Sequence, residues 1–153
     1  MGRDCRNTRQ QTRSGGSYNP PAVETLEGIQ TRKFVMKEKI GEMLKYGIPL
    51  VNSFPRRDRQ TADLMRGAML EMFRLATRLE RKYYKKTTLE DLDVELAVLK
   101  EFILIASDRD YSGPKHAPPL TLHQREVWSR HTTEIGRMIG GYKKAIEAAR
   151  PAT

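Results

Sequence analysis

The sequence has little of what disulfide-rich, membrane-spanning or β-rich proteins need. Its 153 residues contain one cysteine, Cys5, which excludes a framework of intramolecular disulfides and a zinc site built from cysteines. No apolar run approaches the roughly 18–20 residues of a membrane span, and the N-terminal region lacks the apolar core of a secretory signal. Eleven glycines, eight prolines and four phenylalanines are few for the turns and packed strands of a sandwich or barrel. We therefore expect a small, soluble, cytoplasmic protein with no membrane partner.

Positive charge is abundant and unevenly distributed. Lysine and arginine number 28 against 19 acidic residues, a formal net charge of +9. Residues 56–86 carry a net +6, whereas residues 87–120 carry a net −4. A dense block of five cations lies between Arg78 and Lys86, and like charges at that density usually face an anion or open solvent. This pattern indicates a polyanionic partner, most often nucleic acid.

Apolar residues at steps of three and four predict four helices, at about 23–54, 58–84, 88–108 and 121–148. The clearest seam, in the second segment, consists of Met65, Met69, Met72, Ala76, Leu79 and Tyr83. Residues 1–22 lack such a period and are expected to form a disordered basic tail. Because the connections are short, the fold class is all-α, an up-down-up-down four-helix bundle that forms one domain over residues 23–150.

Several residues predict where these helices begin, bend or end. Pro49 removes a backbone donor and is expected to kink the first helix near its end. Thr87 or Thr88 is a plausible N-cap for the third helix. Thr121 is expected to cap the fourth helix, with Gln124 in the capping-box position.

Five acidic residues between positions 90 and 101 allow two interpretations. They would suit a metal cluster, but no histidine lies at a useful spacing from them. Helix capping together with ion pairing to the basic second helix is the favoured reading. It implies that the acidic third helix neutralises part of the positive charge of the second helix.

The sequence carries no arrangement typical of a catalytic centre. His123 and His131 are eight residues apart, so they lack the i, i+4 spacing of a helix-borne zinc site, and His116 lies in a proline-rich loop. Neither a glycine-rich phosphate loop nor a Glu-x-x-His pair occurs. We therefore predict a protein that is not an enzyme and has no metal or other cofactor.

Two glycines inside the fourth predicted helix form a bare stripe. Gly136 and Gly140 are four residues apart, so they lie on one helix face. Such a stripe permits close approach of another helix. That helix can belong to the same bundle or to a second subunit, and the sequence favours neither.

Three stretches together resemble a known family. They are PLVNSFPRR at 49–57, DLDVEL at 91–96 with LIA at 104–106, and LTLHQ at 120–124 with EIGRMIGGY at 134–142. The chain resembles the accessory variability determinant proteins of diversity-generating retroelements over about residues 30–147. It is more distantly similar to the four-helix proteins encoded by intervening sequences of bacterial 23S ribosomal RNA genes.

The resemblance implies a non-catalytic accessory protein in a bacterial or phage-infected cell. Its bundle would assemble into a homopentameric barrel and bind the reverse transcriptase and the template RNA or cDNA, in support of mutagenic cDNA synthesis. Arg137 and Tyr142 lie in the third matched stretch and would serve packing or subunit contacts, together with Gly136 and Gly140. The alternative function is that of the 23S intervening-sequence proteins, an RNA-binding or structural role.

The residues expected to bind nucleic acid or the reverse transcriptase are basic and lie mainly on the second helix. They are Arg56, Arg57, Arg59, Arg66, Arg74, Arg78, Arg81, Lys82, Lys85, Lys86, Arg137, Lys143 and Lys144.

Overall fold

The structure, a computed structural model, describes residues 26–81 and 86–149. Within these residues it contains four α-helices, one short 3-10 helix and no strand. The elements are α2 (Leu26–Asn52), η1 (Arg56–Asp58), α3 (Arg59–Arg81), α4 (Lys86–Ala106) and α5 (Leu122–Ala149). This confirms the all-helical prediction. The tail at 1–22 and the predicted seam residue Tyr83 lie outside the described residues.

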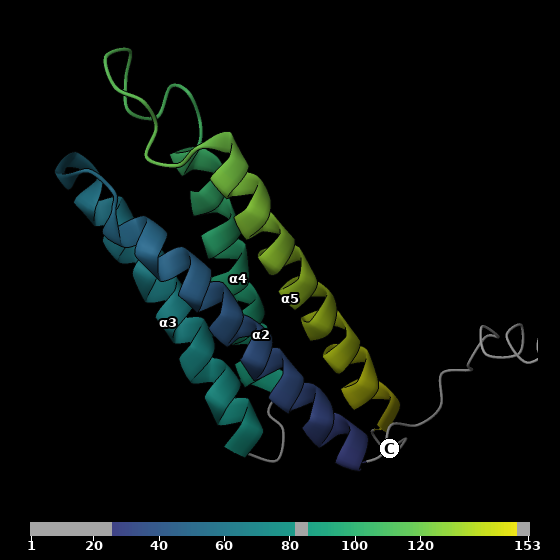
Figure 1. The fold of residues 1–153 in the computed structure, drawn as a ribbon. Helices are drawn as coiled ribbons and strands as arrows, with labels where there is room; N and C mark the ends of the chain where they lie inside the picture. The colour runs from purple at the N-terminus through teal and green to yellow at the C-terminus, as the bar shows by residue number, and fades with distance from the viewer. Residues whose placement is uncertain (1–25, 82–85, 150–153) are drawn as a thin grey trace, which may run out of the picture.

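The helices alternate in direction and form a bundle (Figure 1). α2 packs against α3 and α5, and α4 packs against the same two helices from the other side. No Cα atom of α3 lies within 8 Å of one of α5 in the described residues, so these two helices occupy opposite corners of the bundle. The turn at 53–58 and the loop at 107–121 lie at the same end of the bundle.

The core consists of the apolar seams that the periodicity predicted. Met65, Met69, Met72, Ala76 and Leu79 of α3 are all buried. The matching stripe of α4 is buried as well, and it consists of Leu89, Leu92, Leu96, Leu99, Ile103 and Ala106. Trp128 of α5 is completely buried at 0% exposure. Burial of these side chains is the main source of stability, because each large apolar side chain adds roughly 1.5–3 kcal/mol when removed from water.

Three helices come close together at Gly47 of α2. A Cβ atom placed there would lie 2.6 Å from the Sδ of Met69 on α3 and 2.6 Å from the ring of Trp128 on α5. Only a residue without a side chain fits between these buried groups. Gly47 therefore sets the spacing of α2 against two neighbours at once.

The observed helix ends agree in part with those predicted from the sequence. Thr121 Oγ1 accepts a hydrogen bond from the Gln124 amide, and the Thr121 amide donates to Gln124 Oε1, both at 3.0 Å, which confirms the predicted capping box of α5. α4 begins at Lys86, so Thr87 and Thr88 lie inside its first turn and the predicted N-cap there is wrong. Thr88 is instead buried against the core.

The first helix continues past Pro49 and ends at Asn52. The carbonyl of Leu50 accepts two hydrogen bonds from Ser53, one from its backbone amide at 3.1 Å and one from its hydroxyl at 2.8 Å, which close the last turn of the helix. The 3-10 turn of η1 follows Pro55, whose carbonyl accepts from the Asp58 amide at 2.9 Å.

The long loop between α4 and α5 is anchored to the bundle at two points. Leu120 is buried, and its amide donates to the carbonyl of Ala106 at 3.2 Å, which closes the loop at its base. The Tyr111 and Thr61 hydroxyls are hydrogen bonded to each other, which ties the loop to the start of α3. The loop therefore has a defined position above the end of the bundle (Figure 1).

Candidate nucleic-acid interface

The structure divides the predicted basic residues among separate surfaces. Arg56, Arg57 and Arg59 are exposed at the end of the bundle that carries the long loop. Arg78 and Arg81 lie at the opposite end of α3, about 30 Å away at 1.5 Å of rise per residue. Since α3 and α5 occupy opposite corners, no single face joins the α3 arginines to those of α5. The basic residues expected to bind nucleic acid therefore lie on separate surfaces.

Ion pairs neutralise the arginines in the middle of α3. Arg74 holds Glu71 with two hydrogen bonds of 2.8 and 2.6 Å, and this contact lowers the pKa of Glu71 and raises that of Arg74. Arg66 contacts Asp63 at 2.7 Å and Asn52 of α2 at 2.9 Å. These two guanidinium groups already have partners, so they contribute less to an external anion site.

The end of α3 and the start of α4 hold cations without such partners. Arg78, Arg81 and Lys86 are exposed and form no ion pair within the described part of the chain. Lys82 and Lys85, which belong to the same sequence block, lie outside the described residues. Lys86, the last cation of this block, lies on the first turn of α4.

At the loop end, one carboxylate lies among the arginines. Asp58 is buried at 7% exposure, and its Oδ2 lies 3.8 Å from Nε of Arg57. Arg56 and Arg59 remain exposed. These arginines flank a buried acid on the turn that leads into α3.

The basic residues of α5 that were expected to bind nucleic acid differ in whether they already form an ion pair. Lys143 pairs with Asp93 of α4 at 2.9 Å, whereas Lys144 and Arg137 are exposed. Within the described residues, the acidic cluster of α4 therefore forms its ion pair with α5. The sequence had predicted ion pairing with the second helix. Glu95, by contrast, has its pKa raised by burial and by the nearby carboxylates of Glu71 and Asp91.

Gly136, Gly140 and Tyr142 differ in whether they face other residues of the same protomer. A Cβ at Gly136 would lie 3.5 Å from Nζ of Lys100 and 3.6 Å from Leu96, so this glycine faces α4 of the same bundle. A Cβ at Gly140 would meet nothing within 4 Å. Tyr142 is 1% exposed, and its burial raises the pKa of its hydroxyl to about 12. Of the roles expected for Tyr142, the structure places it in packing within the protomer.

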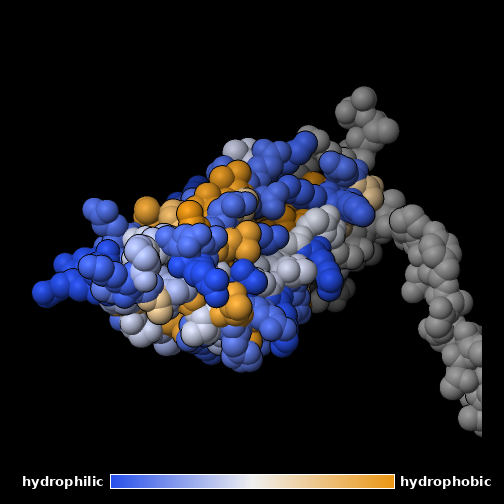
Figure 2. All heavy atoms as spheres, turned by 90° about the horizontal axis from the view of Figure 1, so that it is seen from above, coloured by the Kyte–Doolittle hydropathy of each residue, from blue (hydrophilic) through white to orange (hydrophobic). Residues whose placement is uncertain are grey.

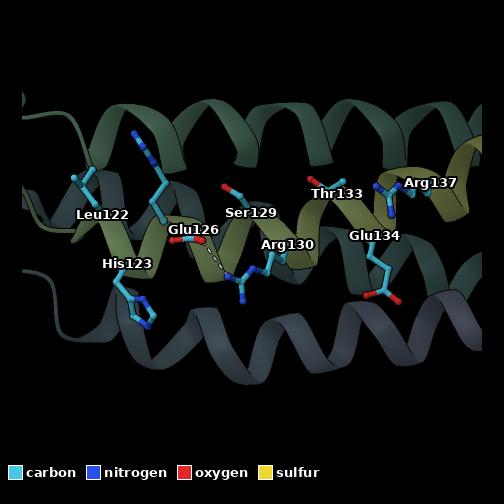
Figure 3. A pocket seen from close by; sticks show the side chains of 9 residues that line it. Leu122, His123, Glu126, Ser129, Arg130, Thr133, Glu134 and Arg137 are labelled. Atoms are coloured by element: carbon cyan, nitrogen blue, oxygen red, sulfur yellow. Dashed lines mark hydrogen bonds and ion pairs between the residues drawn. The ribbon is translucent and has the colours of Figure 1, made fainter.

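Sequence reasoning missed an open groove along α5, whose surface is about half polar (Figure 3). Its lining includes Arg125, Ser129, Thr133 and the predicted residue Arg137. These four residues recur at intervals of four, which is the signal that could have found them. In Figure 3, Ser129 and Thr133 point toward one neighbouring helix of α5, while Glu134 lies on the other side.

An apolar surface on α4 was also missed. Val94, Val98, Leu104 and Ile105 are between 39% and 59% exposed, although their helix is otherwise packed on its inner side. Apolar side chains reach the surface among hydrophilic ones in the view from above (Figure 2). Exposed apolar groups that share a helix face are typical of a surface that another protein covers.

Two further findings concern metals and membranes. Within residues 26–81 and 86–149, no group of three His, Cys, Asp or Glu side chains is placed to hold a metal ion. None of the helices in this described part has both the length and the apolar character that a bilayer crossing requires.

Comparison with known proteins agrees with the motifs noted in the sequence. No curated protein matches the chain. The family model described as bAvd-like matches residues 34–146, well over half of the chain and nearly all of the bundle. The chain therefore belongs to the bAvd-like family of accessory variability determinant proteins.

Proposed function

We propose that the protein is a non-catalytic accessory protein of a diversity-generating retroelement. It binds the reverse transcriptase and the template RNA or cDNA and supports mutagenic cDNA synthesis and retrohoming. The observation that carries this proposal is the bAvd-like match over residues 34–146. The match favours this function over that of the 23S intervening-sequence proteins.

Exposed cations support the nucleic-acid part of the proposal. Arg78, Arg81 and Lys86 have no ion pair within the described residues, so their charge is available to phosphates. Arg74 is engaged with Glu71 and would have to exchange that partner. We therefore assign the main phosphate contacts to this end of α3 and α4 rather than to the middle of α3.

The apolar surface of α4 supports assembly into a homopentamer. Five chains of +9 would repel one another, so their association needs burial of apolar surface at about 25 cal/mol per Å². Val94, Val98, Leu104 and Ile105 offer such a surface, with one acidic residue, Glu101, among them. Gly140 leaves room for close approach beside them on α5.

The test is co-purification with the retroelement's reverse transcriptase and template RNA. The wild-type chain should recover both, and its RNA affinity should fall as salt rises, because phosphate contacts release counterions. The triple variant Arg78→Gln, Arg81→Gln, Lys86→Gln should lose most of the RNA. Its matched control is Arg74→Gln, which removes an arginine of the same helix that is already paired with Glu71.

Two outcomes would contradict the proposal. One is a monomer that shows no RNA affinity at any salt concentration. The other is a gene that lies inside a ribosomal RNA operon with no reverse-transcriptase gene nearby, which would favour the intervening-sequence function instead.

A further inference from the structure

The row of residues at four-residue intervals on α5 has the form of a track. Arg125, Ser129, Thr133 and Arg137 line one groove (Figure 3). Twelve residues separate the two arginines, which places them about 18 Å apart along the helix axis at 1.5 Å per residue. Thr133 and Arg137 are exposed, and Arg125 and Ser129 are half-buried. We call these four residues the α5 track.

The two acidic residues that line the same groove are paired with cations outside the track, and Glu134 shares its lysine with Glu42. Glu126 accepts from Arg130 at 3.0 Å, which Figure 3 marks with a dashed line. Glu134 lies 3.4 Å from Nζ of Lys39 on α2. Arg125 and Arg137, in contrast, form no ion pair within the described residues. The track therefore presents two available guanidinium groups with two hydroxyls between them.

The neighbouring helix α4 adds a third cation. Nζ of Lys100 lies 3.5 Å from the position that a Cβ of Gly136 would occupy, so this ammonium group reaches the side of α5 that the glycine leaves bare. Lys100 has no ion pair in the described part of the chain and is exposed. Gly140 leaves the next turn of α5 open as well.

We propose that the α5 track, with Lys100, binds one strand of nucleic acid through its phosphates. The inference rests on the proposed function, and it assigns a second contact surface at the corner of the bundle opposite α3. Guanidinium groups bind phosphate with paired hydrogen bonds, and Ser and Thr hydroxyls donate to phosphate oxygens. Because no aromatic ring except that of His123 lines the described groove, binding does not depend on base identity.

The test uses the full chain and two short single strands, an oligouridylate and the matching oligodeoxythymidylate. The double variant Arg125→Gln, Arg137→Gln should bind both more weakly than the wild type. The slope of log affinity against log salt should become shallower by about 1.4, since each lost phosphate contact on a single strand contributes about 0.7. The matched control is the double variant Glu126→Gln, Arg130→Gln, which removes the ion pair one row away on the same helix without leaving a free carboxylate beside the track. It should keep the wild-type slope.

The outcomes separate this inference from the proposed function. An unchanged slope in the variant Arg125→Gln, Arg137→Gln, or an equal loss in the control Glu126→Gln, Arg130→Gln, would overturn the proposal. If only the variants of Arg78, Arg81 and Lys86 lose affinity, the track fails while the proposed function stands. If the wild-type chain binds neither strand, the proposed function fails as well. A loss confined to the RNA strand would overturn the phosphate assignment, because phosphates are common to both polymers. Thermal unfolding confirms that each variant is folded.

Discussion

Gly47 offers the sharpest test of how the bundle is packed. Replacing it with alanine adds one methyl group at a point where three helices meet. That carbon would lie 2.6 Å from Met69 Sδ and 2.6 and 2.9 Å from two ring atoms of Trp128. Contacts between such atoms are normally about 3.5–4.0 Å long, so the new group enters space that is already occupied.

The size of the effect follows from two opposing contributions. Alanine favours a helix interior by about 1 kcal/mol over glycine. Overpacking of a filled core costs typically 1–3 kcal/mol, and we expect the upper end because the Trp128 ring is rigid and has 0% exposure. The net expectation is a loss of about 2 kcal/mol in the free energy of unfolding, after subtraction of the helix preference.

The assay is urea unfolding followed by the fluorescence of Trp128, the only tryptophan in the chain. The matched control is Gly67→Ala on α3, where an added Cβ meets nothing within 4 Å. This control should gain up to about 1 kcal/mol from helix preference alone. All variants are compared at one protein concentration, because self-association would change apparent stability. If Gly47→Ala is as stable as the wild type, the packing argument is refuted.

Three further predictions concern a helix end, a buried hydroxyl and an ion pair. Thr121→Ala removes the acceptor of the α5 capping box and should lower the free energy of unfolding by about 1 kcal/mol in urea titrations. The folded-state pKa of Tyr142, about 12, lies above its ordinary value of 10.0, so its contribution to stability is complete below pH 10 and declines between about pH 10 and 12. Thermal unfolding of Tyr142→Phe across this range should show a smaller decline, and an identical decline would contradict the assignment. Asp93→Asn breaks the ion pair with Lys143, and because both groups are partly exposed the loss should stay below about 1 kcal/mol and vanish in high salt.

The helices could be predicted from sequence because their cores repeat with the helical period. Met65 and Met69 of α3 and Leu92 of α4 lie at the expected buried positions, since burial follows the period of the apolar residues. The capping box at Thr121 was also predictable, because both of its hydrogen bonds are local to four residues. The start of α4 was not, because capping preference at Thr88 competes with burial of that residue against the core.

The candidate site could be predicted only as a list of charges. Sequence placed Arg74 and Arg78 among the basic residues of one helix, and both are exposed. It could not show that Arg74 is held by Glu71 while Arg78 has no ion pair in the described residues. Local side-chain geometry decides that difference. Arg125 was missed because the sequence does not show that its neighbour Glu126 is paired with Arg130. Only that pairing leaves the charge of Arg125 available.

By itself, the sequence determined the helical class, the apolar seams and the uneven +9 charge, because each depends on composition and on the spacing of nearby residues. The tertiary structure decided which charges remain available and where they lie. It placed α3 and α5 at opposite corners, so the basic residues of these two helices do not lie on one face of the bundle. The physical reason is that the interaction energy of a charge depends on its burial and on its distance from other charges. Packing between helices sets both.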